Sequence, residues 1–254
     1  MKIGILGCGA ISNIIVTNIV SDNLDIDLSY FFDNDIERAE NLANIAGGIA
    51  VLSFDEMIDK VDLVLEAASP SSVKTYASKV LEKGKDIIIM SIGSLMDIEL
   101  RENLIKIAKE NNTKIHAPSG AVVGLDGIRA VANLNLTETS LITRKSPKSL
   151  GKDSKKEEVL FEGKASEAVK KFPVNINVAA AISLACKRDI DVKIIVDPNV
   201  SRNIHEIIIK GEFGEFHTKV MNLPCNANPK TSVLAAFSAI NLLKNFNSTF
   251  VIGN

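Results

Sequence analysis

Cysteine is scarce in this chain, because only Cys8, Cys186 and Cys225 occur among 254 residues, and they lie far apart. An odd number of widely separated cysteines is not typical of a disulfide framework and lacks the paired spacing of a zinc site. We therefore expect three free thiols, a reducing cytoplasmic location and no metal centre.

A surplus of either charge is also missing. The chain has 29 Lys and Arg against 31 Asp and Glu, which gives a formal net charge of −2. Without a basic surplus or a block of like charges, nothing favours nucleic acid or a membrane surface as a partner.

Long apolar runs are absent as well. Gly, Ser, Asn or Asp interrupts each apolar stretch well before the length of a membrane span, and Gly7 and Gly9 break the first one. We therefore expect neither a transmembrane helix nor a signal peptide. The composition, 46% hydrophobic and 24% charged, is enough for a full core. The length fits one large domain or two modest ones.

The first half of the chain alternates short β-rich runs with helical patterns. We expect strands at 2–6, 26–32, 63–66, 86–89 and 114–116. We expect helices between them at 12–21, 35–46, 54–60, 71–83 and 97–111. Strands and helices that alternate with short connections predict a parallel sheet with right-handed crossovers.

The rhythm changes after Pro118. After a cluster of glycines at 120, 124 and 127, we expect a short helix and then strands rich in Thr, Leu and Val. We next expect a polar turn at 152–158, helices at 166–171 and 177–187, and strands at 191–196, 206–210 and 215–220. Asn228 and Pro229, as N-cap and first residue, predict a last helix that runs to about Phe246. The chain is thus predicted to be an α/β protein with a doubly wound domain over 1–118. A smaller α+β domain with a mixed sheet follows over 119–227, and the C-terminal helix within 228–254 packs back on the first domain.

A glycine turn directly follows the first expected strand. Gly7 allows the tight turn, and Gly9 lets the backbone approach a pyrophosphate at the N-terminus of the next helix. Ser12 stands where a third glycine is usual, and its small side chain still permits close packing of helix and strand. Asp33 ends the second strand, where its carboxylate would accept a hydrogen bond from a ribose 2′-OH. Together these features predict a Rossmann-type domain whose cofactor contacts are Gly7, Gly9, Ala10, Ile11 and Asp33.

The residues after Asp33 bear on the choice of dinucleotide. Asn34 occupies the place where an NADP site would have an arginine, which favours NAD, although Arg38 is near enough to keep NADP as an alternative. Two further strand ends carry small residues, "EAASPSSV" and "MSIGSL". Such residues leave room for a cofactor at the carboxyl edge of the sheet, and ordinary loops are the other interpretation. The predicted contacts there are Ala68, Ser69 and Ser91.

Of the three histidines, His205 in "DPNVSRNIHEI" is the candidate for chemistry. An imidazole with an ordinary pKa of about 6.5 can give and take a proton near neutral pH. We expect His116 and His217 to be structural. For His205 the residues alone leave a catalytic and a structural role equally open.

Amide and cationic side chains elsewhere in the second half of the chain are further candidates for binding. Asn175 and Asn177 precede a small-residue helix, where they could bind a nicotinamide carboxamide or, for Asn177, cap the helix. Several cations suit substrate carboxylates, although each could also be surface charge. The candidate substrate-binding residues are Arg144, Lys145, Asn203, Lys230 and Thr231, with Arg202 as a further cation.

Eight stretches, in order over nearly the whole chain, resemble the L-aspartate dehydrogenase family. They are "GILGCGAI", "EAASPSSV", "PSGAVVGLDG", "TRKSP", "LFEGKASEAVKKFPVNINVAAAISLA", "VDPNVSRNIHEI", "GEFGEF" and "NPKTSVLAAFSAI". The resemblance implies NAD(P)-dependent oxidation of L-aspartate, through iminoaspartate, to oxaloacetate and ammonia. It also implies a supply of iminoaspartate for NAD biosynthesis and a homodimer.

The same resemblance implies site residues. It places the active-site histidine on His205 and cofactor contacts on Ala121 and on either Asn175 or Asn177. Val123 stands where the family pattern has glycine. Two other readings remain: another two-domain reductase, similar to dihydrodipicolinate reductase or homoserine dehydrogenase, and a non-catalytic NAD-binding sensor.

Overall fold

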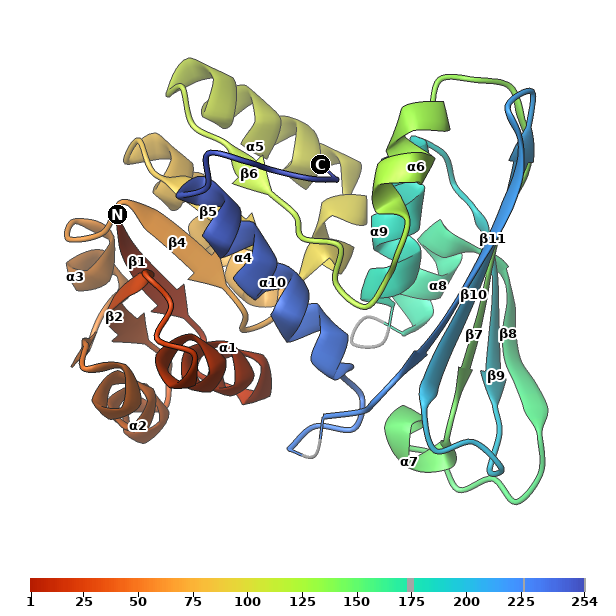
Figure 1. The fold of residues 1–254 in the computed structure, drawn as a ribbon, viewed down its shortest axis with the longest axis horizontal. Helices are drawn as coiled ribbons and strands as arrows, with labels where there is room; N and C mark the ends of the chain where they lie inside the picture. Colours follow the sequence, from red (N-terminus) through yellow and green to blue (C-terminus); the bar gives the residue numbers. More distant parts are fainter. Residues whose placement is uncertain (173–175, 226, 254) are drawn as a thin grey trace. The chain divides into compact units, whose positions relative to one another are not determined.

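The computed structural model describes residues 1–172, 176–225 and 227–253. The chain forms two compact units. Unit 1 contains Met1–Pro118 and Ala236–Val251, and unit 2 contains Ser119–Ala235 with the C-terminal residues from Ile252. The colours of Figure 1 follow the chain from the first unit through the second and back to the first.

Unit 1 is built on a six-stranded parallel sheet with the strand order β3-β2-β1-β4-β5-β6. Its strands are β1 (Lys2–Leu6), β2 (Asp27–Phe32), β3 (Ile49–Ala50), β4 (Leu63–Glu66), β5 (Asp86–Ile89) and β6 (Ile115–His116). The strand order reverses beside β1, so the ends of β1 and β4 lie next to each other at a topological switch point. In such sheets ligands bind at the carboxyl ends of the strands.

Helices cover both faces of this sheet, which confirms the predicted doubly wound architecture. One face carries α1 (Ala10–Ser21), α2 (Ile36–Ala46) and α10 (Val233–Phe246), whose apolar residues share one buried cluster with β1, β2 and β4. Gly4 points to the other face, since an added Cβ would lie 3.0 Å from Met57 of α3 (Phe54–Ile58). The remaining helices of the unit are α4 (Pro70–Glu82), the short 3-10 helix η1 (Ile92–Met96) and α5 (Ile98–Glu110).

Local sequence signals explain where these helices begin and end. Ser53, Ser69 and Asp97 cap α3, α4 and α5 by accepting a backbone N–H from three residues ahead. Pro70 is the first residue of α4, where the missing N–H costs nothing. Gly47 ends α2 in the left-handed conformation that glycine adopts readily.

Unit 2 is built on a five-stranded mixed sheet with the order β11-β10-β7-β9-β8. Its strands are β7 (Leu136–Lys145), β8 (Glu158–Lys164), β9 (Asp191–Val196), β10 (Asn203–Gly211) and β11 (Gly214–Asn222). Only β7 and β9 pair in parallel, so the predicted mixed sheet is confirmed. Figure 1 shows α6 (Leu125–Val131), α8 (Ala165–Lys171) and α9 (Asn177–Cys186) along one side of this sheet, and α7 (Pro147–Leu150) near the end of β7.

The expected start of the last helix is wrong. Asn228 does not cap a helix, because its side chain accepts the N–H of Lys230 in a local turn. The chain then runs back along residues 223–225, where Thr231 accepts the N–H of Cys225, and α10 begins only at Val233. Tertiary pairing has displaced the helix start that Asn and Pro indicate locally.

Three short elements, β3, η1 and α7, and the strand β8 were not expected from the sequence. Strand β10 begins at Asn203 rather than at Glu206, so it includes His205. Among the described residues, no helix is both long enough and apolar enough to cross a membrane.

Candidate active site

The glycine turn after β1 has the geometry that its two glycines predict. Gly7 has a φ of +92°, and an added Cβ would lie only 2.4 Å from the Cβ of Ala68, so no larger residue fits. An added Cβ at Gly9 would meet nothing within 4 Å. Gly7 therefore allows the turn after β1 to pack against the turn at Ala68, whereas Gly9 faces open space.

This open space lies at the N-terminus of α1. Gly9 is the N-cap residue and provides no capping side chain, so the N–H groups of the first turn, at Ala10 and Ile11, can serve an anion. Ser12 is completely buried and donates its hydroxyl to the Gly7 carbonyl oxygen. The residue that replaces the third glycine thus stabilises the turn it belongs to.

Asp33 is fixed beside the same turn. Its Oδ2 accepts the backbone N–H of Cys8 at 2.7 Å, and its Oδ1 accepts that of Asp35 at 2.9 Å. Each carboxylate oxygen keeps a lone pair for a further donor, such as a ribose hydroxyl. Arg38 pairs with Asp35 through Nε at 3.0 Å on the surface.

Cys8 does not provide a reactive group in this turn. Its thiol is buried, and burial, followed by the negative charge of Asp33, raises the pKa of Cys8 to about 12. The thiol therefore stays protonated and behaves as a small apolar side chain.

Glu66, the last residue of β4, is a site residue that the sequence analysis missed. Its side chain is fully buried, and Oε1 accepts the N–H groups of Ala68 and Ser69, each at 2.9 Å. Ser91 donates its N–H to Oε2 at 3.0 Å and its hydroxyl to Oε1 at 2.9 Å. Burial raises the pKa of Glu66, and the hydrogen bonds from Ser91, Ala68 and Ser69 oppose that rise.

The predicted contacts Ala68, Ser69 and Ser91 are thus brought together at the carboxyl edge of the sheet. Ala68 contacts Gly7, Ser69 caps α4, and Ser91 is tied to both by Glu66. An open position at Gly9, an uncapped helix N-terminus and a fixed Asp33 carboxylate fit the diphosphate and ribose of a dinucleotide.

His205 is the centre of a second cluster, in unit 2. It lies on β10 opposite Thr143 of β7 and Val220 of β11, and only 1% of it is exposed. Its Nδ1 lies 3.1 Å from the hydroxyl oxygen of Thr143. Burial, followed by the positive charge of Lys145, lowers the pKa of His205 to about 3, so the imidazole is neutral near pH 7.

Lys145 lies on the same face of β7 as Thr143, since side chains alternate along a strand. It is 4% exposed, and its ammonium donates to the carbonyl oxygen of Lys230 at 3.2 Å. No carboxylate of the described residues pairs with it. Burial lowers the pKa of Lys145 to about 8. A buried cation without an acidic partner is costly for stability and suits an anionic ligand.

Asn203 completes this cluster. It is fully buried two residues before His205 on the same face of β10, and its amide group donates to Ser232 Oγ at 3.3 Å. Its Oδ1 is buried and has no hydrogen-bond partner in the part of the chain that the structure describes. Asn222, opposite Asn203 on β11, donates to the carbonyl oxygen of Ala121 at 3.0 Å, which brings Ala121 to the same end of the sheet.

The other predicted substrate cations lie elsewhere. Arg144 points to the opposite face of β7 from Lys145, and its Nη1 is 2.8 Å from both Glu157 and Asp197. Lys230 is exposed and reaches the cluster through its carbonyl oxygen, while Thr231 contributes backbone bonds to the adjoining turn. Arg202 is exposed. The structure therefore brings Lys145, rather than Arg144, to His205.

The structure describes only one of the two asparagines that the sequence places near α9. Asn177 is the first residue of α9 rather than its cap, which is Ile176, and its side chain is exposed. Asn175 lies outside the described residues.

The other two histidines occupy different surroundings. His116 Nε2 lies 3.1 Å from Asp86, and its ring packs edge-on against Phe246 at 4.9 Å between centroids. His217 is exposed on β11. Within the described ranges, no three His, Cys, Asp or Glu residues meet in a way that could hold a metal ion.

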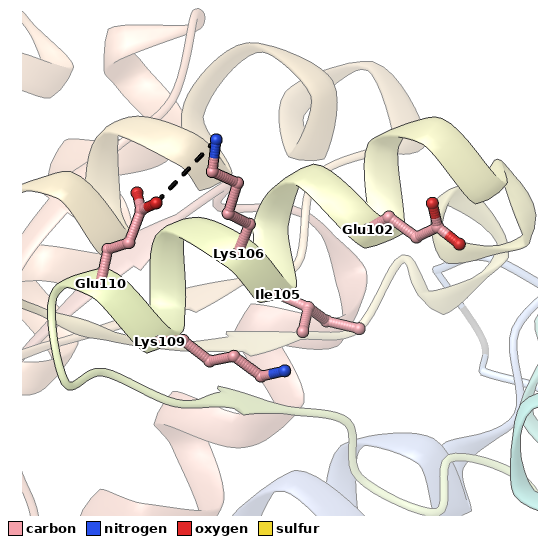
Figure 2. A pocket seen from close by; sticks show the side chains of 5 residues that line it. All are labelled: Glu102, Ile105, Lys106, Lys109 and Glu110. Atoms are coloured by element: carbon pink, nitrogen blue, oxygen red, sulfur yellow. Dashed lines mark ion pairs between the residues drawn. The ribbon is translucent and has the colours of Figure 1, made fainter.

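A surface pocket on unit 1 is separate from both clusters. Figure 2 shows that the labelled residues come from one helix, α5, with Lys106 paired to Glu110. Their side chains are exposed, and none is a predicted site residue. The residues that line it are Glu102, Ile105, Lys106, Lys109 and Glu110.

Sequence comparison identifies the family. The chain is 54% identical to an L-aspartate dehydrogenase of Methanothermobacter thermautotrophicus, over 100% of this chain and 98% of that protein. It is 43% identical to an L-aspartate dehydrogenase of Methanospirillum hungatei, over the full length of both. The chain belongs to the L-aspartate dehydrogenase family. Enzymes with this name are oxidoreductases that act on a CH–NH2 group.

Two family models match different parts of this L-aspartate dehydrogenase family member. Residues 126–246 match the model described as aspartate dehydrogenase, C-terminal. Residues 7–118 match the model described as homoserine dehydrogenase, NAD binding domain. The second match, which lies in unit 1, supports a nicotinamide dinucleotide as the cofactor.

Solved structures agree with the fold of this family member. An aspartate dehydrogenase of Thermotoga maritima has a TM-score of 0.82 and 31% sequence identity, covering 100% of this chain and 99% of that one. A WlbA dehydrogenase of Bordetella pertussis shares only the fold, with a TM-score of 0.59 and 11% identity over 98% of this chain and 89% of that one.

Proposed function

We propose that this protein oxidises L-aspartate to iminoaspartate with a nicotinamide dinucleotide, and that water then converts iminoaspartate to oxaloacetate and ammonia. The observation that carries the proposal is the buried cluster of His205, Lys145 and Asn203 on one face of the second sheet. This cluster lies within the residues that match the C-terminal part of aspartate dehydrogenases. It combines a proton acceptor, a cation and an amide, which suit an amino acid with two carboxylates.

The residues of unit 1 hold the dinucleotide in this proposal. The first-turn N–H groups of α1 bind the diphosphate across the open position at Gly9, and Asp33 accepts from the adenosine ribose. When bound, the dinucleotide supplies the acceptor for the hydride that leaves the substrate Cα. Asp33 followed by the exposed Asn34 favours NAD, and NADP is the alternative. Ala121 and either Asn175 or Asn177 remain predicted contacts to the cofactor.

Lys145 is the proposed partner of a substrate carboxylate. Its ammonium is buried and donates to a backbone carbonyl, and no acidic side chain of the described residues pairs with it, so a substrate carboxylate would supply the opposite charge. An ion pair formed in such a place favours the charged form of Lys145. Binding of the dicarboxylate therefore makes the local field less positive around His205.

His205 is the proposed acid–base residue. When Nδ1–H donates to the Thr143 hydroxyl, Nε2 carries a lone pair and can accept a proton. The neutral imidazole takes a proton from the water that attacks the imine carbon, and it returns one in the reverse amination. Burial, followed by the positive charge of Lys145, lowers the pKa of His205, and a bound substrate anion offsets the second of these two causes.

The wider setting follows from the same proposal. We place the enzyme in the cytoplasm as a homodimer, with iminoaspartate passing to a condensing enzyme of NAD biosynthesis. Light scattering of the purified protein tests the dimer: a single species of twice the 27.4 kDa chain mass supports it, and a monomer contradicts it.

The test of the activity is direct. Purified protein is mixed with L-aspartate and NAD, then with L-aspartate and NADP, and reduced nicotinamide is followed by absorbance. D-aspartate, L-glutamate and L-homoserine serve as controls. Reduction with L-aspartate alone is the expected result, and oxaloacetate with ammonia should consume NADH. Turnover of L-homoserine instead would favour the homoserine dehydrogenase reading that the match over residues 7–118 keeps open. Binding of NADH without turnover of any amino acid would favour a sensor.

A further inference from the structure

Glu66 is a buried carboxylate that the reaction described above does not use. It has no exposed surface, and no Lys, Arg or His of the described residues forms an ion pair with it. Burial of an acid without a cation is costly, and an apolar residue in its place would commonly serve stability as well or better. The role of Glu66 therefore follows from the groups that donate hydrogen bonds to its carboxylate oxygens.

The carboxylate of Glu66 joins two turns that are more than 20 residues apart in sequence. Oε1 holds the backbone of Ala68 and Ser69 after β4, and Oε2 holds the backbone of Ser91 after β5. Ala68 lies against Gly7, so the position of the turn after β4 bears on the glycine turn after β1. One side chain thus holds the backbone at two strand ends by hydrogen bonds, and Ala68 links them to a third by packing.

Glu66 also sets the direction of the Ser91 hydroxyl. That hydroxyl has one hydrogen, which it donates to Oε1 of Glu66 at 2.9 Å. Its oxygen can then act towards a ligand only as an acceptor. The groups of a nicotinamide dinucleotide that suit such an oxygen are the ribose hydroxyls and the carboxamide N–H groups.

We propose that Glu66 is a positioning residue for the dinucleotide: it locks the turns at Ala68–Ser69 and Ser91 and makes the Ser91 hydroxyl an acceptor towards the cofactor. This inference rests on the proposed function to the extent that unit 1 binds NAD or NADP. It assigns Glu66 no contact with the substrate and no proton transfer.

The main test is the Glu66→Gln variant, which keeps the size of the side chain but replaces one acceptor oxygen with a donor. NADH affinity is measured by the change in nicotinamide fluorescence, without substrate. Losing one of these buried hydrogen bonds should raise the Kd for NADH about tenfold. The KM for the dinucleotide should rise in parallel, while kcat and the KM for L-aspartate change by less than about twofold. The matched control is Glu56→Gln on α3, which removes an exposed ion pair between Glu56 and Lys60. This control should leave the Kd for NADH unchanged.

A double-mutant cycle with Ser91→Ala separates positioning from general loosening of the fold. Ser91→Ala should weaken NADH binding by itself but should add little in the Glu66→Gln protein, because the hydroxyl is no longer directed there. Equal NADH affinity of wild type and Glu66→Gln, or fully additive effects, would overturn the proposal. If Glu66→Gln does not fold, Ser91→Ala decides: unchanged NADH affinity at an unchanged melting temperature contradicts the role, and reduced affinity supports it.

The experiment also separates this inference from the proposed function. A wild-type protein that does not bind NADH or NADPH contradicts both. A wild-type protein that binds NADH but does not oxidise L-aspartate contradicts the substrate and leaves the Glu66 comparison fully measurable.

Discussion

The two candidate sites are built in different ways. The site in unit 1 consists mainly of backbone: N–H groups of the α1 N-terminus, a bare position at Gly9, and turns held by Glu66. The site in unit 2 consists of side chains on strands, with Lys145 from β7 and His205 from β10. Backbone groups suit a diphosphate, whose charge is spread over several oxygens. Side chains suit a small substrate whose bonds change, because they bring acid–base groups and localised charge.

The largest expected effect concerns His205. If it is the acid–base residue, His205→Asn should lower kcat by about 10²–10⁴-fold while the Kd for NADH stays the same. Steady-state kinetics with L-aspartate and fluorescence titration with NADH measure the two quantities. His217→Asn, at an exposed position on β11, is the control. An unchanged kcat in His205→Asn would remove His205 from the chemistry.

The next effect concerns Lys145. It tests whether a charged side chain binds the ligand in unit 2, in contrast to the backbone groups of unit 1. Lys145→Met removes the buried cation and should raise the KM for L-aspartate by about 10²-fold, since a charge-assisted contact is lost. Lys230→Met is the matched control, because Lys230 reaches the cluster through its backbone carbonyl only. A larger effect of Lys230→Met than of Lys145→Met would show that the wrong cation has been assigned.

A third prediction uses the titration of Lys145 in the ligand-free protein. Its pKa falls from 10.5 to about 8 on folding, so between these values the unfolded chain binds more protons and stability rises with pH. The cost of the buried charge is fully present below about pH 8. Relative to Lys145→Met, the wild type should gain about 2 kcal/mol between pH 7 and pH 9.5. Denaturant melts of both proteins measure this difference, and a constant difference would contradict the lowered pKa.

The smallest expected effect concerns the open position in unit 1. Gly9→Ala adds a methyl group where the ligand-free protein has free space, so the melting temperature should not change. The methyl group would occupy room needed by the diphosphate, and the Kd for NADH should rise about tenfold. Gly127→Ala, in α6 of unit 2 with room for a methyl group, is the control for binding. NADH affinity that survives Gly9→Ala would place the diphosphate elsewhere.

Local residues indicate the arrangement of the first candidate site more directly than that of the second, because of how each is assembled. Gly7, Gly9 and Asp33 follow neighbouring strands in a pattern that local residues reveal. Lys145 and Arg144 are adjacent, and nothing in the residue types tells which of them faces His205. Strand alternation decides this once β7 is placed, and it turns Arg144 towards Asp197. The last helix shows the same limit, since pairing with residues 223–225 overrides the local signal at Asn228.

By itself, the sequence determined the α/β class, the order of most elements, the glycine turn and the family. These depend on hydrophobic period, turn residues and contiguous motifs, which are properties of neighbouring residues. Only the tertiary structure decided that Glu66 joins the turns at Ala68 and Ser91, and that Lys145 is buried with no acidic partner among the residues described. Burial and hydrogen-bond partners depend on strands that come together from distant parts of the chain, and residue spacing along the sequence does not contain that information.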